Sequence, residues 1–171
     1  MKKIVLFIVP VLFVACKKEQ ATKSVVQDTL GLRTKKSSVT LIIDGKTYVY
    51  DHIDWKKSKI KKEEDLRLRI LQAHLPRVEF KFPEIQKALS NGEGNFTVPD
   101  LDRGLKQLQL KFFDETRVVK NKLNKYIVFR KGEIQAKLSG NNFTMSFTGE
   151  GGPMADKTIT FPISGTININ F

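Results

Sequence analysis

Cysteine, tryptophan and histidine are scarce in this chain of 171 residues, which has one Cys, one Trp and two His. A single cysteine cannot form a disulfide within the chain, so the fold must be stabilised by its core. Zinc sites usually need three or four ligands at defined spacing, and two isolated histidines do not supply them. The motifs Gly-x-Ser-x-Gly and His-Glu-x-x-His are also missing. We therefore expect no catalytic residues, no metal and no other cofactor, in a protein that is not an enzyme.

One long apolar run stands near the N-terminus, at residues 4–14, directly after Lys2 and Lys3. As a helix it would span about 16 Å, against roughly 30 Å for the hydrocarbon core of a bilayer, so it is too short to cross a membrane. Pro10 interrupts it as well. Basic residues, a short apolar run and then a small residue, here Ala15, are typical of a secretory signal peptide.

The only cysteine, Cys16, follows Ala15 directly. The segment FVAC at residues 13–16 resembles the lipobox of bacterial lipoproteins, with phenylalanine where leucine is most common. The resemblance implies that residues 1–15 are removed and that Cys16 carries a diacylglycerol and usually a further acyl chain such as palmitate. The charged KKE that begins at Lys17 is similar, in part, to the export signal of surface lipoproteins of Bacteroidota. The implied location is the outer membrane, on its periplasmic or its cell-surface face. A reactive thiol or an intermolecular disulfide is the alternative role for a lone cysteine.

Basic residues outnumber acidic residues by 30 to 18. Without Lys2 and Lys3 the mature chain keeps 28 basic and 18 acidic residues, a net charge of +10, which favours anionic partners. We expect no nucleic-acid partner, because an exported protein seldom meets nucleic acid. Residues 16–37 are polar and are predicted to form a flexible tether. Within it, residues 28–30 resemble an acceptor motif for O-glycosylation in Bacteroidota, with Thr29 as the acceptor.

Residues 38–171 have the length of one compact domain, and apolar residues alternate with polar ones along much of it, as in β-strands. Asp44-Gly45 suits a tight hairpin turn between strands at 39–43 and 48–50. Two further hairpins are predicted. Strands at 133–138 and 143–147 flank a turn at 139–142, and strands at 159–163 and 167–171 flank Ser164-Gly165.

The middle of the domain is harder to assign. Residues 78–82 alternate as a strand, and residues 83–90 fit a short helix that ends at Asn91-Gly92. Residues 63–75 and 100–112 fit either a strand or a helix, so both assignments stay open. The sequence therefore predicts a mainly antiparallel all-β domain, a β-sandwich or a small calycin-like barrel, with one or two short helices.

Three short motifs in this domain, IIDGK (42–46), GEI (132–134) and ISGT (163–166), occur in an order that resembles small uncharacterised β-rich lipoproteins of Bacteroidota. The resemblance implies the same fold and an envelope location. It implies no catalytic residues.

Five lysines lie within the seven residues that follow the only tryptophan. An aromatic ring beside clustered ammonium groups suits an anionic membrane surface or a polyanion. The candidate contact residues are Trp55, Lys56, Lys57, Lys59, Lys61 and Lys62. A solvated loop, offset by the acidic residues at 63–65, is the alternative interpretation.

Asp51, His52 and Asp54 form the best candidate for a chemical site. If His52 and Asp54 share one face of a strand, their side chains lie side by side. The imidazole could then act as a base, or the imidazole and the carboxylate could both bind a metal ion. We interpret the segment instead as a solvated strand end or turn.

Together these features favour an exported, membrane-anchored lipoprotein that acts as a non-enzymatic binding or structural module of the envelope. Its partner would be another envelope protein, a glycan or an anionic lipid headgroup. Two alternatives stay open. A calycin-like carrier of a small apolar ligand rests on the many short strands and the twelve phenylalanines. A hydrolase of envelope polymers rests on Asp51, His52 and Asp54 alone.

Overall fold

The computed structural model describes residues 37–99 and 107–170, and nearly all of its regular structure is antiparallel β-sheet. Two short helical segments accompany the strands: α2 (Ile85–Ala88) and the 3-10 turn η2 (Lys122–Lys125). The strands are β1 (Ser38–Ile43), β2 (Lys46–Tyr50), β3 (Lys59–Lys62), β4 (Leu66–Ile70), β5 (Arg77–Phe82), β6 (Glu93–Val98), β7 (Gln109–Phe113), β8 (Tyr126–Ser139), β9 (Asn142–Pro153) and β10 (Phe161–Asn170). The predicted all-β antiparallel class is confirmed.

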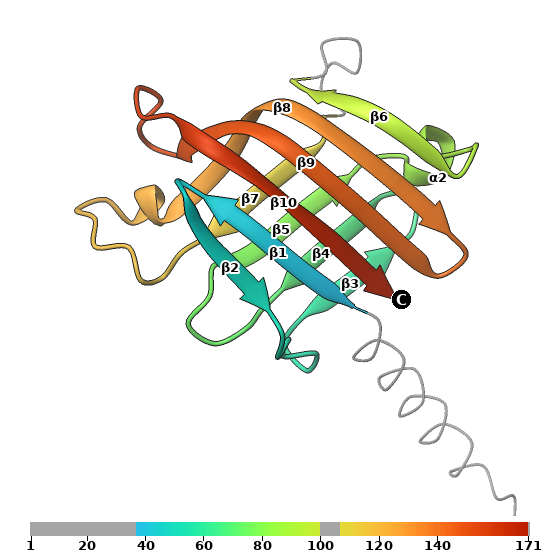
Figure 1. Cartoon of the computed structure of the whole chain (residues 1–171), viewed down its shortest axis with the longest axis horizontal. Helices are drawn as coiled ribbons and strands as arrows, with labels where there is room; N and C mark the ends of the chain where they lie inside the picture. The colour runs from blue at the N-terminus through green and yellow to red at the C-terminus, as the bar shows by residue number, and fades with distance from the viewer. Residues whose placement is uncertain (1–36, 100–106, 171) are drawn as a thin grey trace, which may run out of the picture.

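The ten strands belong to one strongly curled sheet, an open half-barrel. Nine of them follow the order β2-β1-β10-β9-β8-β7-β5-β4-β3, and β6 pairs with β8 off this path. In Figure 1 the strands β2, β1, β10, β9 and β8 form a front layer, and β7, β5, β4 and β3 lie behind it as a back layer. The sheet thus has two outer faces that point in opposite directions.

Strand β8 connects the two layers. Its first residues, 126–128, pair with β7, whereas residues 132–137 pair with β6. Between these two parts the pairing with β9 shifts register at a bulge around Arg130. A bulge bends a strand and increases its twist. The sheet therefore curls at this point of β8.

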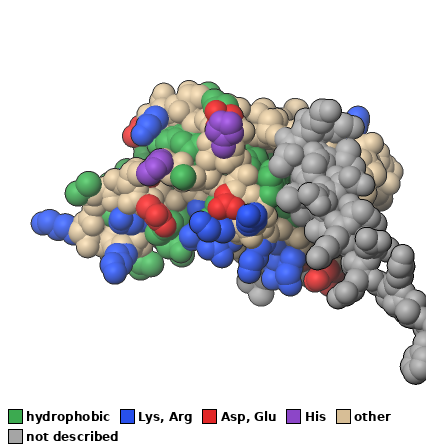
Figure 2. Space-filling view, turned by 90° about the horizontal axis from the view of Figure 1, so that it is seen from below, with side chains coloured by type: hydrophobic (Ala, Val, Ile, Leu, Met, Phe, Trp, Pro, Cys, Tyr) green, Lys and Arg blue, Asp and Glu red, His purple; other side chains and the backbone are tan. Residues whose placement is uncertain are grey.

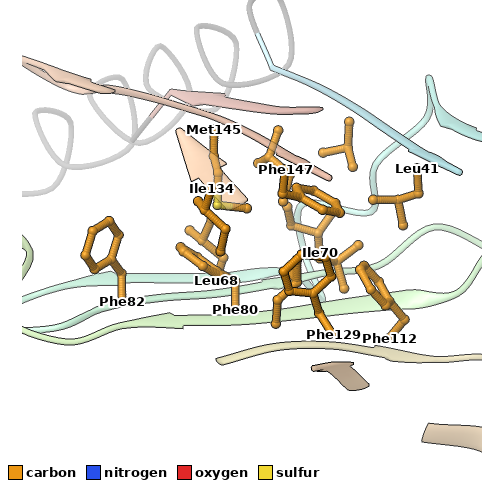
Figure 3. Packing of buried hydrophobic residues seen from close by; sticks show 14 of the residues in the cluster. Leu41, Leu68, Ile70, Phe80, Phe82, Phe112, Phe129, Ile134, Met145 and Phe147 are labelled. Atoms are coloured by element: carbon orange, nitrogen blue, oxygen red, sulfur yellow. The ribbon is translucent and has the colours of Figure 1, made fainter. Parts of the chain in front are cut away.

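The core fills the space between the two layers. Phe80 of β5 stacks on Phe143 of β9 with 5.9 Å between ring centroids, and Phe112 of β7 stacks on Phe147 of β9 at 6.3 Å. Figure 3 shows side chains from both layers meeting in this space. A ligand bound between the layers would have to displace these packed side chains.

Most of the predicted strands and turns are confirmed. Asp44 and Gly45 have φ angles of 54° and 75° in the tight turn between β1 and β2. β8 and β9 form the second predicted hairpin, and α2 lies within the predicted short helix. Each of the two open segments contains a strand: β4 lies within 63–75, and β7 begins in 100–112 and ends one residue beyond it, at Phe113.

The third predicted hairpin is wrong, because β10 runs without interruption through Ser164-Gly165. Gly165 lies between β1 and β9, and a Cβ atom there would lie 2.4 Å from the backbone oxygen of Thr40. The glycine allows three strands to approach closely and does not make a turn. The predicted signal peptide, most of the tether, Cys16 and Thr29 lie outside the described residues.

Candidate anion-binding face

Basic side chains cover the outer face of the back layer because of the two-residue period of its strands. In β4, Leu66, Leu68 and Ile70 are buried in the core, so Arg67 and Arg69 between them point outward and are exposed. The same alternation applies to β3, β5 and β7. We call the resulting set the basic face, and its members are Lys59, Lys61, Arg67, Arg69, Lys81 and Lys111.

The strand register places like charges directly opposite one another. Lys61 pairs with Arg67 across β3 and β4, and Arg67 pairs with Lys81 across β4 and β5. Three cations thus occupy one row across strands spaced about 4.8 Å apart. A second like-charged pair, Lys59 and Arg69, lies one step along the strands. Like charges directly opposite destabilise a sheet, so this arrangement costs folding free energy.

Few carboxylates offset this charge. Asp65 is bonded to Arg67 at 3.1 Å and to Lys81 at 3.2 Å. Burial opposes ionisation of Asp65, but the hydrogen bonds from Lys81 and Arg67 outweigh it and hold the pKa of that carboxyl below its usual value. Glu79 is held by Arg77 at 2.7 Å.

The other four cations of the basic face, Lys59, Lys61, Arg69 and Lys111, have no ion pair with any residue in the described ranges. Lys59 and Lys61 are therefore available to an incoming anion, whereas Arg69 and Lys111 lie directly opposite Glu79 in the strand register. Guanidinium groups can bind phosphate or carboxylate through two parallel hydrogen bonds, and ammonium groups add point charges. In Figure 2, Lys and Arg side chains gather along the lower side of the molecule, where the back layer lies.

The structure separates the predicted lysine cluster. Lys59 and Lys61 lie on the basic face, whereas Lys56 and Lys57 lie in the turn before β3. Lys57 is paired with Asp54 at 3.4 Å.

Two predicted members of that cluster point elsewhere. The Lys62 ammonium donates to the backbone oxygen of Gly140 at 3.1 Å. Trp55 is partly buried against the core, so its ring does not extend the basic face.

Sequence reasoning missed Arg67, Arg69, Lys81 and Lys111. These residues are separated along the chain by apolar positions and only become neighbours when the strands pair. A signal was present in the segment LRLRI, where an exposed strand face is entirely basic.

Asp51, His52 and Asp54 lie in the segment between β2 and β3. Asp51 and His52 form a bend, the His52 side chain is 88% exposed, and its Nε2 atom lies 4.0 Å from Asp51. Asp54 instead accepts the backbone N–H groups of Lys56 and Lys57. In the part of the chain that the structure describes, no group of three or more His, Cys, Asp or Glu side chains could hold a metal ion.

The opposite outer face, on the front layer, has a different character. It carries a groove of about 670 Å³ over β6, β8, β9 and β10. Its outward-pointing residues are uncharged apart from Glu93 and Lys137, which pair with each other at 3.5 Å. The uncharged ones are Asn95, Gln135, Thr144, Ser146, Thr166 and Asn168. The two outer faces of the sheet therefore differ sharply in charge.

No helix within residues 37–99 and 107–170 has the length and hydrophobicity needed to cross a bilayer. Comparison of the chain with protein-family models, with curated proteins and with solved structures finds no significant match.

Proposed function

We propose that this protein is an exported, lipid-anchored envelope protein, without enzymatic activity, whose β domain binds anionic groups of an envelope polymer through the basic face. The observation that carries the proposal is that Lys59, Lys61, Arg69 and Lys111 on this face have no ion pair with a described residue. The like-charged pairs across β3 and β4, Lys59 with Arg69 and Lys61 with Arg67, cost stability in the free protein, and an anion over them would offset that cost.

The N-terminal sequence supports the anchor. The FVAC segment that ends at Cys16 resembles a lipobox, and each buried methylene of an acyl chain contributes about 0.8 kcal/mol to membrane binding. Two or three acyl chains would hold the domain at the membrane. The basic face would then select phosphate-bearing or carboxylate-bearing polymers near that surface.

Charge reversal on β3 tests the binding site. In the variant Lys59→Glu/Lys61→Glu, each new carboxylate would lie opposite an arginine, Arg69 or Arg67. We expect the free energy of unfolding to rise by about 0.5 to 1 kcal/mol, because two repulsive pairs become attractive. We expect the affinity for polyphosphate or polygalacturonate to fall at least tenfold. Urea denaturation and titration calorimetry on the mature protein in detergent measure the two effects.

The matched control is Lys87→Glu/Lys131→Glu, which makes the same change in net charge at exposed residues off the basic face. It should keep most of the affinity. The polyphosphate and polygalacturonate titrations distinguish a phosphate ligand from a carboxylate ligand. Equal affinities for the β3 variant and the control, or no binding of either polymer by the wild-type protein, would refute the proposed function.

Replacement of Cys16 by serine tests the anchor. The native protein should show a lipid-sized increase in intact mass and should partition into the detergent phase, and Cys16→Ser should lose both properties. A native protein that is unmodified, water-soluble and carries a free thiol would contradict lipid anchoring.

A further inference from the structure

Four aliphatic side chains protrude from two loops at one end of the half-barrel. Val118 and Leu123, between β7 and β8, are 101% and 51% exposed, and Met154 and Ile159, between β9 and β10, are 45% and 46% exposed. We call these four residues the apolar tip. Within the described residues only two other large hydrophobic side chains are exposed, Ile42 and Val49 on the front layer. Exposed aliphatic residues are thus concentrated at this end.

The two loops lie against each other. The backbone N–H of Met154 donates to the backbone oxygen of Tyr126, the residue that follows η2, at 2.7 Å. The Arg117 guanidinium from the first loop lies over the ring of Phe161, at the start of β10, 5.8 Å from its centroid. Both loops lie at the left of Figure 1. The two loops that carry the aliphatic side chains therefore lie together at one end of the half-barrel.

Side-chain hydrogen bonds hold both loops in place. In the first loop, buried Asp114 accepts the backbone N–H and the hydroxyl of Thr116 at 2.9 and 2.6 Å, and the Asn121 side chain accepts the N–H of Leu123 at 2.9 Å. In the second loop, the Arg130 guanidinium donates to four backbone oxygens. The aliphatic residues are thus presented to solvent by ordered backbone, which keeps the entropy cost of engaging a partner low.

Basic residues lie in the same two loops as the apolar tip. Lys120, Lys122 and Lys157 are exposed in the same two loops and have no ion pair with a described residue. Aliphatic side chains flanked by ammonium groups match a surface with an apolar interior and a negatively charged rim.

We propose that the apolar tip inserts into a lipid bilayer that contains anionic headgroups, with the neighbouring lysines contacting those headgroups. The aliphatic residues project from two loops outside the groove of the front layer, which suits a fluid surface better than a shaped protein partner. Each inserted side chain contributes enough to change membrane partitioning about tenfold. The tip is separate from the basic face, so the proposal does not depend on polymer binding there.

A depth-sensitive fluorophore tests insertion directly. In the full chain carrying Cys16→Ser, a cysteine introduced by Leu123→Cys, Met154→Cys or Val49→Cys is the only thiol, so an NBD label reports on one site. The position of Val49 is the matched control, because it is 57% exposed and lies on the front layer. On vesicles of phosphatidylethanolamine and phosphatidylglycerol, labels at Leu123 and Met154 should shift their emission to the blue and be quenched by a lipid-chain quencher. The label at Val49 should do neither.

Substitutions at the tip give a second readout. With the label at Met154, Val118→Asp should raise the lipid concentration for half-maximal emission change about tenfold, and Val49→Asp should leave it unchanged. The proposal is overturned if the three labels respond alike or not at all. A blue shift that needs no vesicles and grows with protein concentration would also overturn it, because a second copy of the chain would then cover the tip.

Discussion

Replacement of Gly149 by alanine is expected to lower the free energy of unfolding by at least about 3 kcal/mol. Gly149 of β9 pairs with Gly132 of β8 beside the bulge at Arg130. A Cβ atom on Gly149 would lie 2.1 Å from the backbone oxygen of Lys131 and 2.6 Å from the Cα atom of Gly132. Both obstacles are backbone atoms, so the methyl group can be accepted only if the two strands move apart. Urea denaturation followed by circular dichroism measures the change.

The control for this substitution is Gly140→Ala, in the turn between β8 and β9. Gly140 has a φ angle of 58° and no atom within 4 Å of an ideal Cβ position. Its replacement should cost only the left-handed backbone penalty of about 1 kcal/mol. If the two variants are equally stable, the strands do not approach closely enough at Gly149 to exclude a methyl group.

Removal of the Arg130 guanidinium should open the loop between β9 and β10. This group donates to the backbone oxygens of Pro153, Asp156, Lys157 and Ile159, so one side chain fixes most of the loop. We expect Arg130→Ala to lower the free energy of unfolding by about 2 to 4 kcal/mol, because hydrogen bonds from a charged donor are stronger than neutral ones. Trypsin should cleave after Lys157 at least tenfold faster than in the wild-type protein.

Two variants define the cause of that effect. Arg130→Lys keeps the charge but replaces the planar guanidinium with a compact ammonium group. It should therefore restore only part of the protection against trypsin. Lys131→Ala removes the neighbouring exposed side chain of β8 and should leave cleavage unchanged. If Arg130→Ala is cleaved at the wild-type rate, the loop is held by other contacts.

The strands could be predicted from sequence wherever one face of the strand is buried and the other is exposed to solvent. LRLRI at β4 and the turn at Asp44-Gly45 illustrate this, because alternation and positive φ angles are local properties of the chain. Gly165 shows the limit. A glycine between two apolar runs suits a turn, and only the packing of β10 between β1 and β9 shows that it serves close strand approach.

The candidate site was predictable only in part for a related reason. Lys59 and Lys61 were identified because they belong to a run of five lysines in seven residues, whereas Arg67 and Lys81 join them only through the register of β3, β4 and β5. Charge repulsion across strands is a property of pairing, and pairing partners cannot be read from one strand alone.

The difference in charge between the two outer faces also affects how the domain is oriented before it contacts a partner. Cations on the back layer and a neutral groove on the front layer make the domain an electric dipole directed across its two layers. Within about 8 to 10 Å of an anionic polymer at physiological salt, the field exerts a torque on such a dipole. The domain would rotate during its approach so that the back layer arrives first, and a larger share of its encounters would begin in the orientation that the proposed polymer binding requires.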